Sequence, residues 1–197
     1  FRQGADSRMN SAQELNQEMM ASDNGASSAA GLLLDAQHLG TLMRKNRQLQ
    51  LGFLSSGGWD THINQGNVTG LLANNLSNLT NALIQLRSSF NEPNDVVIVA
   101  SEFGRTCAEN GTRGTDHGHG NVMWLMGDAV QGGQCHGRWD GLAIESLNER
   151  RDLPVHHDFR GIFAQALKRC LGVSPSKLAE VFPGYPGDSD LNGLFKA

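Results

Sequence analysis

The chain has 197 residues, of which 39% are hydrophobic and 18% are charged, and this balance is typical of a globular protein. With 20 acidic against 16 basic residues and a net charge of −4, the sequence argues against a nucleic-acid partner, because binding phosphates requires a basic face. No apolar run approaches the roughly 20 residues of a membrane-spanning helix, so we expect no membrane span.

The first half of the chain predicts a polar arm followed by a helix, a strand and a second helix. Residues 1–27 are polar with few large apolar side chains, and we expect them to form an N-terminal arm. From Ser28 the apolar residues recur at helical spacing, and His38 falls on the apolar side, where we expect it to pack in the core. Residues 48–56 predict a short strand, and the leucine-rich segment 67–90 predicts the clearest helix of the chain.

The second half of the chain predicts two more strands and a helix. VVIVA at residues 96–100 is continuously apolar, as expected for a strand that is buried on both faces of a parallel sheet. Residues 121–127 predict a further strand. Asp158 is placed to cap a helix that Gly172 ends.

The order of these elements predicts an α/β fold. Helices that alternate with strands favour a layered domain with a mainly parallel sheet, which we expect over residues 28–175. The remaining residues, 176–197, are rich in turn-forming side chains and predict a loop-rich C-terminal tail. In sheets of this kind ligands bind at the carboxyl ends of the strands, so polar residues that follow strands are the candidates for a functional site.

Three polar motifs follow predicted strands. GGWDTH offers Asp60 and His62, two residues apart, which point to one side of an extended backbone. SEFGRT comes directly after the buried strand and offers Glu102 and Arg105. The third motif, GTDHGHG, offers Asp116, His117 and His119.

These residue types suit a metal centre that acts on an oxyanion. Carboxylate oxygen and imidazole nitrogen are ligands for divalent ions such as Zn²⁺, Mn²⁺ and Fe²⁺, with Ca²⁺ as a further candidate. An arginine binds the oxygens of a phosphate or sulfate bidentately, and a metal beside it would describe ester hydrolysis at phosphorus or sulfur. Simpler interpretations stay open: Asp60 caps a turn, Glu102 and Arg105 pair with each other, and DHGH is a polar loop.

The combination of motifs resembles a bacterial family, domain of unknown function 1501. GGWDTH, a leucine-rich helix, DVVIVASEFGRT and GTDHGHGNVMWLMGDAV follow one another as in that family over residues 28–172. The family is similar to the alkaline phosphatase and sulfatase superfamily, so the resemblance implies a three-layer α/β/α sandwich with a mainly parallel sheet, incomplete in this chain. In that superfamily a Ser-Asp-His-Gly-like motif supplies metal ligands. Here Glu102 stands in place of the aspartate and Phe103, which cannot bind a metal, in place of the histidine.

The resemblance implies a metal-dependent hydrolase of phosphate or sulfate esters, or the ligand-bearing C-terminal half of one, since no segment resembles the strand that carries the superfamily's nucleophile. Glu102 would then be a metal ligand or general base, and Arg105 would hold the oxyanion. The expected metal ligands are Asp60, His62, Asp116, His117 and His119. The alternative, favoured by Phe103, is a non-catalytic alkaline-phosphatase-like domain that serves as a binding or structural subunit.

The resemblance also carries expectations about partners and location. The substrate would be a small-molecule ester, and the protein partner would be the N-terminal half of the same protein or another subunit. Exported relatives imply the periplasm or the cell surface.

Overall fold

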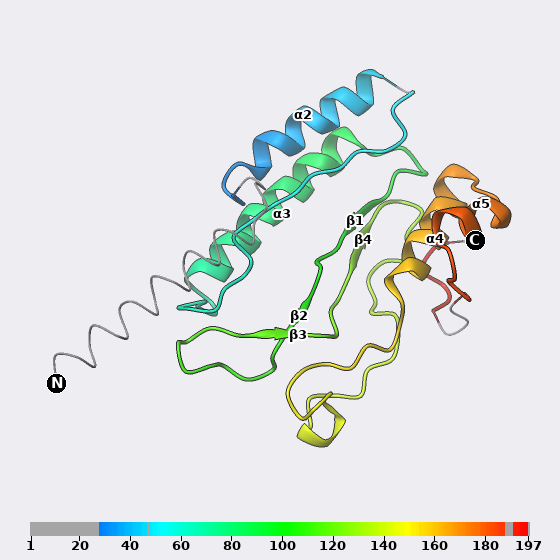
Figure 1. The fold of residues 1–197 in the computed structure, drawn as a ribbon. Coiled ribbons are helices and arrows are strands. Elements are labelled where there is room, and N and C mark those ends of the chain that lie inside the picture. The colour runs from blue at the N-terminus through cyan, green and yellow to red at the C-terminus, as the bar shows by residue number, and fades with distance from the viewer. Residues whose placement is uncertain (1–27, 47, 188–190, 197) are drawn as a thin grey trace, which may run out of the picture. The chain divides into compact units, whose positions relative to one another are not determined.

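The structure, a computed structural model, describes residues 28–46, 48–187 and 191–196, and the predicted arm of residues 1–27 lies outside them (Figure 1). The chain divides into two compact units. The first unit runs to Phe90 and also takes in Ala108–Asp116, and the second combines Asn91–Cys107 with His117–Ala197. The chain therefore passes from the second unit into the first and back again within the loop that follows SEFGRT.

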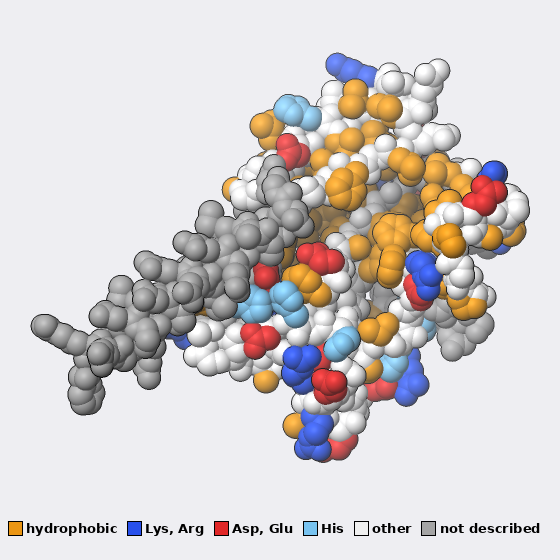
Figure 2. Space-filling model, in the orientation of Figure 1, with side chains coloured by type: hydrophobic (Ala, Val, Ile, Leu, Met, Phe, Trp, Pro, Cys, Tyr) orange, Lys and Arg blue, Asp and Glu red, His pale blue; other side chains and the backbone are white. Residues whose placement is uncertain are grey.

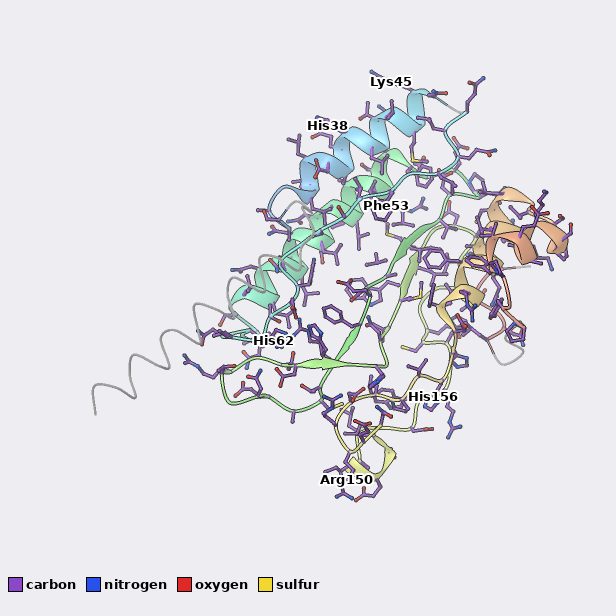
Figure 3. The ribbon with its side chains drawn as sticks, viewed as in Figure 1. His38, Lys45, Phe53, His62, Arg150 and His156 are labelled. Carbon is purple, nitrogen blue, oxygen red and sulfur yellow. The ribbon has the colours of Figure 1, made fainter. Side chains whose placement is uncertain are left out.

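Two packed helices form the first unit. Helix α2 spans Leu32–Lys45 and helix α3 spans Leu71–Ser89, which confirms both predicted helices. The buried face of α2 has helical spacing, and at Gly40 a side chain would bring its Cβ to 2.8 Å from the Cβ of Ser89, so the glycine permits close packing. The expectation for His38 is wrong: this side chain is exposed, and like Lys45 it projects away from the helix pair (Figure 3).

The predicted strand at residues 48–56 is not formed in the described part of the chain. The segment has no ladder partner, and next to it Gly57 makes one isolated parallel bridge to Ser28. Its alternating apolar side chains are therefore left on the surface, with Leu51 73% and Phe53 87% exposed. Large hydrophobic side chains also reach the surface elsewhere, as the space-filling view shows (Figure 2).

The second unit contains two short antiparallel ladders instead of a parallel sheet. Strand β1 (Val97–Val99) pairs with β4 (Trp124–Met126), and β2 (Gly104–Arg105) pairs with β3 (His117–Gly118). The two ladders follow one another along a single hairpin, in which residues 97–105 run against 117–126.

The prediction of a three-layer sandwich with a mainly parallel sheet is therefore wrong. Parallel neighbours need a crossover of a dozen or more residues, usually a helix, whereas no helix lies between residues 100 and 121 in the described structure. The chain turns back on itself there, and the two apolar segments pair in opposite directions. The residues of β1 are accordingly half-buried rather than enclosed on both faces.

The C-terminal part of the second unit is helical. Helix α4 spans Phe159–Leu171; Asp158 caps its first turn by accepting from the backbone N–H of Arg160 at 2.9 Å, and Gly172 ends it in the left-handed conformation with φ of 64°. These boundaries confirm the predicted helix. A second helix, α5 (Pro175–Val181), begins the segment that was expected to be loop-rich. A single 3-10 turn at Ile144–Ser146 precedes both.

The α2–α3 interface predicts the effect of enlarging a buried alanine. Ala82 on α3 is 1% exposed, and we expect Ala82→Leu to lower the free energy of unfolding by about 1–3 kcal/mol, because a packed interface has no room for the added methylenes. The matched control Asn81→Leu lies on the exposed side of the same helix and should change it by no more than about 0.5 kcal/mol. Urea unfolding measures both, and equal effects would contradict the packing.

The cap of α4 predicts a pH-dependent contribution to stability. Hydrogen bonds from the Arg160 guanidinium, stronger than the opposing effect of burial, hold the pKa of Asp158 below its ordinary value. The stabilisation is therefore complete above the unfolded pKa of about 3.9 and disappears as the pH falls through the lower folded pKa. We expect Asp158→Ala to cost about 1 kcal/mol at pH 7 and much less near pH 2. Urea unfolding at both pH values tests this, and a constant cost would contradict it.

Candidate metal centre

In the first unit, the GGWDTH loop is held against the N-terminal part of α3. The buried side chain of Asn75 donates from Nδ2 to the carbonyl oxygen of Gly58 at 2.7 Å, and Gly58 adopts a φ of 84° that favours glycine. Trp59 donates from its indole nitrogen to Ser56 at 3.1 Å. The following residues, Asp60 and Thr61, are buried at 9% and 1% exposure. These contacts fix the position of the loop and of the polar side chains that it carries.

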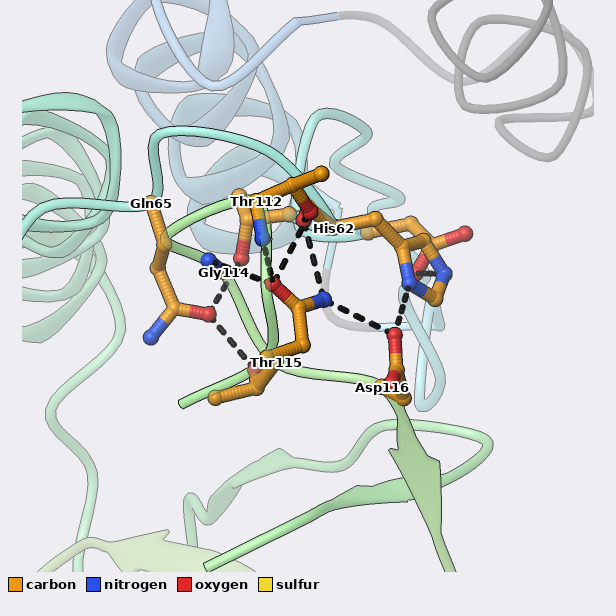
Figure 4. Close-up of polar contacts among 9 residues, drawn as sticks. His62, Gln65, Thr112, Gly114, Thr115 and Asp116 are labelled. Carbon is orange, nitrogen blue, oxygen red and sulfur yellow. Dashed lines mark hydrogen bonds and ion pairs between the residues drawn. The ribbon is translucent and has the colours of Figure 1, made fainter. Parts of the chain in front are cut away.

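The loop at residues 108–116 is joined by hydrogen bonds to residues 61–65, which start at the end of GGWDTH and belong to the same unit (Figure 4). Backbone hydrogen bonds run from Asn64 to the carbonyl of Thr112 at 3.0 Å and from Thr115 to the carbonyl of Thr61 at 3.2 Å. The side-chain oxygen of Gln65 accepts from the hydroxyls of Thr61 and Thr115, each at 2.7 Å. These bonds connect two segments that are about fifty positions apart in the chain.

Gly114 and Asn110 make this close approach possible. A side chain at Gly114 would overlap the carbonyl group of His62, so only glycine fits. Asn110 donates from Nδ2 to the carbonyl oxygen of His62 at 3.1 Å and to Oδ1 of Asp116 at 2.9 Å. Its own Oδ1 accepts from the backbone N–H groups of Thr112 and Gly114, each at 3.0 Å.

The result is an aspartate–histidine–aspartate cluster made of Asp60, His62 and Asp116. Nε2 of His62 lies 3.0 Å from Oδ1 of Asp60, and Nδ1 lies 2.9 Å from Oδ1 of Asp116. The side chains of Asp60 and His62 are 10% and 19% exposed, whereas that of Asp116 is 54% exposed. The cluster is therefore buried on one side and open to solvent on the other.

The geometry of this cluster calls for a cation or a second proton. A neutral imidazole carries one N–H and can donate to only one carboxylate, yet both ring nitrogens of His62 face carboxylate oxygens. Two carboxylates beside one imidazole, one of them buried, are costly without a compensating positive charge. Both contacts have the length of an N–H···O hydrogen bond, and a single ion would take only one of the two ring nitrogens as a ligand.

The second unit holds the other residues that the sequence singled out. His117 and Arg105 face each other in the β2–β3 ladder. The ring of Phe103 stacks on His117 with centroids 3.9 Å apart and planes 17° apart, and the Arg105 guanidinium lies 5.4 Å from the same ring centroid. Phe103, which cannot bind a metal, thus orients the side chains of two candidate site residues. Glu102 is exposed.

His119 belongs to a separate cluster in the second unit. Its ring Nδ1 lies 3.0 Å from Oδ2 of Asp152, and its backbone N–H donates to the same oxygen. Asp152 is fully buried. Burial opposes the ionisation of this carboxyl, but hydrogen bonds from His119 and Asn148 outweigh it, so the pKa of Asp152 is lower than its ordinary value.

The structure thus distributes the predicted site residues over the two units. Asp60, His62 and Asp116 come together in the first unit. The remaining four lie in the second unit: Glu102, Arg105, His117 and His119.

The sequence gives little sign of the residues that support these clusters. Asn110 and Gln65 connect the two segments of the first unit, and Asp152 holds His119 in the second. The only available signal for Asn110 was its position in the turn sequence NGTRG, and for Asp152 there was none, because a single aspartate after an arginine pair is usual at a surface.

Comparison with known proteins gives the family. A family model described as "Protein of unknown function (DUF1501)" matches residues 1–182. The chain belongs to the DUF1501 family. No curated protein and no solved structure matches it.

The DUF1501 assignment confirms the resemblance inferred from GGWDTH, SEFGRT and GTDHGHG. All three motifs, with the clusters described above, lie within the matched residues. Among the described residues, no helix combines the length and the apolar character that crossing a bilayer requires.

The contact at Gly114 predicts which substitution separates the two segments. We expect Gly114→Ala to lower the free energy of unfolding by about 1–3 kcal/mol and to speed amide hydrogen exchange at residues 61–65 and 112–115, because the new methyl group pushes the loop away from His62. The control is Gly111→Ala, which meets no atom within 4 Å and should leave exchange unchanged. Equal exchange in both variants would contradict the close approach.

Proposed function

We propose that this DUF1501 protein is a metal-dependent hydrolase of phosphate or sulfate esters. The observation that carries the proposal is the pair formed by Asp60 and His62, in which Nε2 of the imidazole lies 3.0 Å from Oδ1 of a carboxylate that is only 10% exposed. Carboxylate oxygens and imidazole nitrogens are the ligand types that Zn²⁺ and Mn²⁺ take in proteins.

The ligands would come from the first unit and the residue that follows it. Asp60, His62 and Asp116 supply two carboxylates and an imidazole. His117 is joined to Asp116 by a peptide bond, so its Cα is about 3.8 Å from that of Asp116. The carboxylate of Asp60 and the imidazoles of His62 and His117 are a set of donors suited to a metal ion.

The hydrogen bonds around the cluster support a binding role. The amide of Asn110 bonds one oxygen of Asp116 and the backbone of His62, so two ligands share one support. Such outer contacts orient metal ligands and sharpen their geometry before the ion arrives.

The hydrolytic part of the proposal concerns the residues of SEFGRT. Arg105 would bind the non-bridging oxygens of the ester, and its position over Phe103 limits the directions in which the guanidinium can point. When bound, a divalent ion would polarise the ester and lower the pKa of water. In the reaction a water oxygen bonds to phosphorus or sulfur, the bond to the alcohol oxygen breaks, and the alcohol leaves with a proton.

One observation favours the non-catalytic alternative. Phe103 fills with an aromatic ring the position where a metal-binding histidine was expected, and it packs on His117. A domain that binds a ligand without turning it over would keep such a stack. Kinship with alkaline phosphatases, an exported location and a protein partner stay predictions.

Metal binding tests the first part of the proposal. We expect the full chain to bind Zn²⁺ or Mn²⁺ by isothermal titration calorimetry, and Asp60→Asn and His62→Gln each to weaken binding at least tenfold, because each removes one ligand. The control Asp35→Asn removes a carboxylate of the same unit that lies in the first turn of α2. Binding that is absent, or unchanged in both ligand variants, would contradict the metal centre.

Turnover of p-nitrophenyl phosphate and p-nitrophenyl sulfate by the metal-loaded chain tests the second part. We expect hydrolysis of one of the two, with kcat/KM at least tenfold lower in Arg105→Ala. Metal binding without any turnover would favour the binding domain over the hydrolase.

A further inference from the structure

The two ring nitrogens of His62 cannot both bind the proposed ion. Nε2 faces Oδ1 of Asp60 at 3.0 Å, and Nδ1 faces Oδ1 of Asp116 at 2.9 Å. The nitrogens point in different directions from the ring, so a single ion takes one of them, and the other is left to bond the carboxylate beside it. The two aspartates therefore have different roles at this centre.

The oxygen of Asp116 that faces His62 also accepts a second hydrogen bond (Figure 4). Asn110 donates from Nδ2 to this Oδ1 at 2.9 Å, and Nδ1 of His62 lies 2.9 Å from the same atom. A carboxylate oxygen has two lone pairs, and two N–H donors occupy both of them. This oxygen is therefore suited to accept from an imidazole N–H rather than to bind an ion.

Asn110 bonds the backbone of His62 as well. Its Nδ2 donates to the His62 carbonyl oxygen at 3.1 Å, and the hydroxyl of Thr112 donates to the same oxygen at 2.7 Å. The Oδ1 of Asn110 accepts from the backbone N–H of Gly114 at 3.0 Å, which fixes the amide itself. The hydrogen bonds thus form a closed path from the His62 ring through Asp116 and Asn110 to the His62 backbone, and the whole path lies in the first unit.

This closed path fixes the direction of the His62 ring. Because the backbone is held at one end and Nδ1 at the other, the side chain cannot turn about its bonds without breaking a hydrogen bond. Histidines that bind metals commonly donate their second ring N–H to a carboxylate, which sets the orientation of the ring. Asp116 has the position of such a carboxylate.

Asp60 has the properties of the carboxylate that binds the ion. Its side chain is 10% exposed, against 54% for Asp116. A carboxylate withdrawn from water is stabilised by a bound cation more than one that water already solvates. Among the residues that the structure describes, the set of three donors suited to one ion contains Asp60 and His62 but not Asp116.

We propose that Asp116 is a positioning residue, which accepts a hydrogen bond from Nδ1 of His62 and turns Nε2 towards the ion that Asp60 binds. This role rests on the proposed metal centre and changes one assignment in it, since Asp116 supports a ligand and does not touch the ion. Loss of such a support typically weakens metal binding roughly 10- to 100-fold.

Titration of the full chain with Zn²⁺ tests this role through two substitutions at one position. Asp116→Ala removes the acceptor, and we expect it to raise Kd roughly 10- to 100-fold. Asp116→Asn keeps an oxygen that the Asn110 amide holds in place, so we expect a rise of less than about tenfold, well below that of Asp60→Asn. The control Glu109→Gln removes an exposed carboxylate of the same loop and should leave Kd unchanged. Equal losses in Asp116→Asn and Asp60→Asn would overturn the proposal.

A double-mutant cycle gives a readout that a general loss of stability does not imitate. In a His62→Gln background we expect Asp116→Ala to cause no further loss of Zn²⁺ affinity, because no imidazole is left to orient, whereas Asp60→Asn still causes its own loss. A further loss from Asp116→Ala would overturn the proposal. So would a crystal structure of the zinc-loaded chain in which Asp116 or Nδ1 of His62 lies about 2.0–2.2 Å from the ion.

The same titration separates this role from the proposed function. If the wild type binds no Zn²⁺, the proposed metal centre fails and the role of Asp116 fails with it. If the wild type binds Zn²⁺ through Asp116, the metal centre stands and only the positioning role is overturned.

Discussion

The close approach of the loop at residues 108–116 to the segment after GGWDTH is the constraint on which the candidate site depends. The approach requires a glycine at 114, because any side chain there would overlap the backbone of His62. It also requires Asn110, whose one amide group bonds the backbone of His62 and the side chain of Asp116. Without this approach, Asp116 would have no fixed relation to a histidine 54 positions away in the chain.

The two units share one arrangement, in which a buried aspartate lies against the ring of a histidine. In each, a buried aspartate lies against an imidazole, Asp60 beside His62 and Asp152 beside His119. In each, glycines near the histidine permit two stretches of backbone to come close together. A buried carboxylate is costly alone, and a nearby imidazole supplies the hydrogen bond that makes burial tolerable. In each unit the contact with the buried carboxylate fixes one nitrogen of the histidine ring.

The elements that the sequence analysis predicted correctly are those controlled by neighbouring residues. Helices α2, α3 and α4 follow from apolar spacing, and the ends of α4 follow from a side-chain cap at Asp158 and a left-handed glycine at 172. The error in the sheet has an equally local cause. VVIVA has the composition of an enclosed parallel strand, but direction depends on the connection, and the connection contains no helix that could carry the chain across.

By itself, the sequence determined the helices, the family and the chemical types of the candidate site residues, because spacing, capping and side-chain chemistry are properties of short segments. Only the tertiary structure decided that Asp60, His62 and Asp116 form one cluster, that Asp152 supports His119 and that the strands are antiparallel. These features depend on backbone hydrogen bonds and close contacts between segments far apart in the chain. The residue pattern of one segment does not indicate which distant segment it will contact.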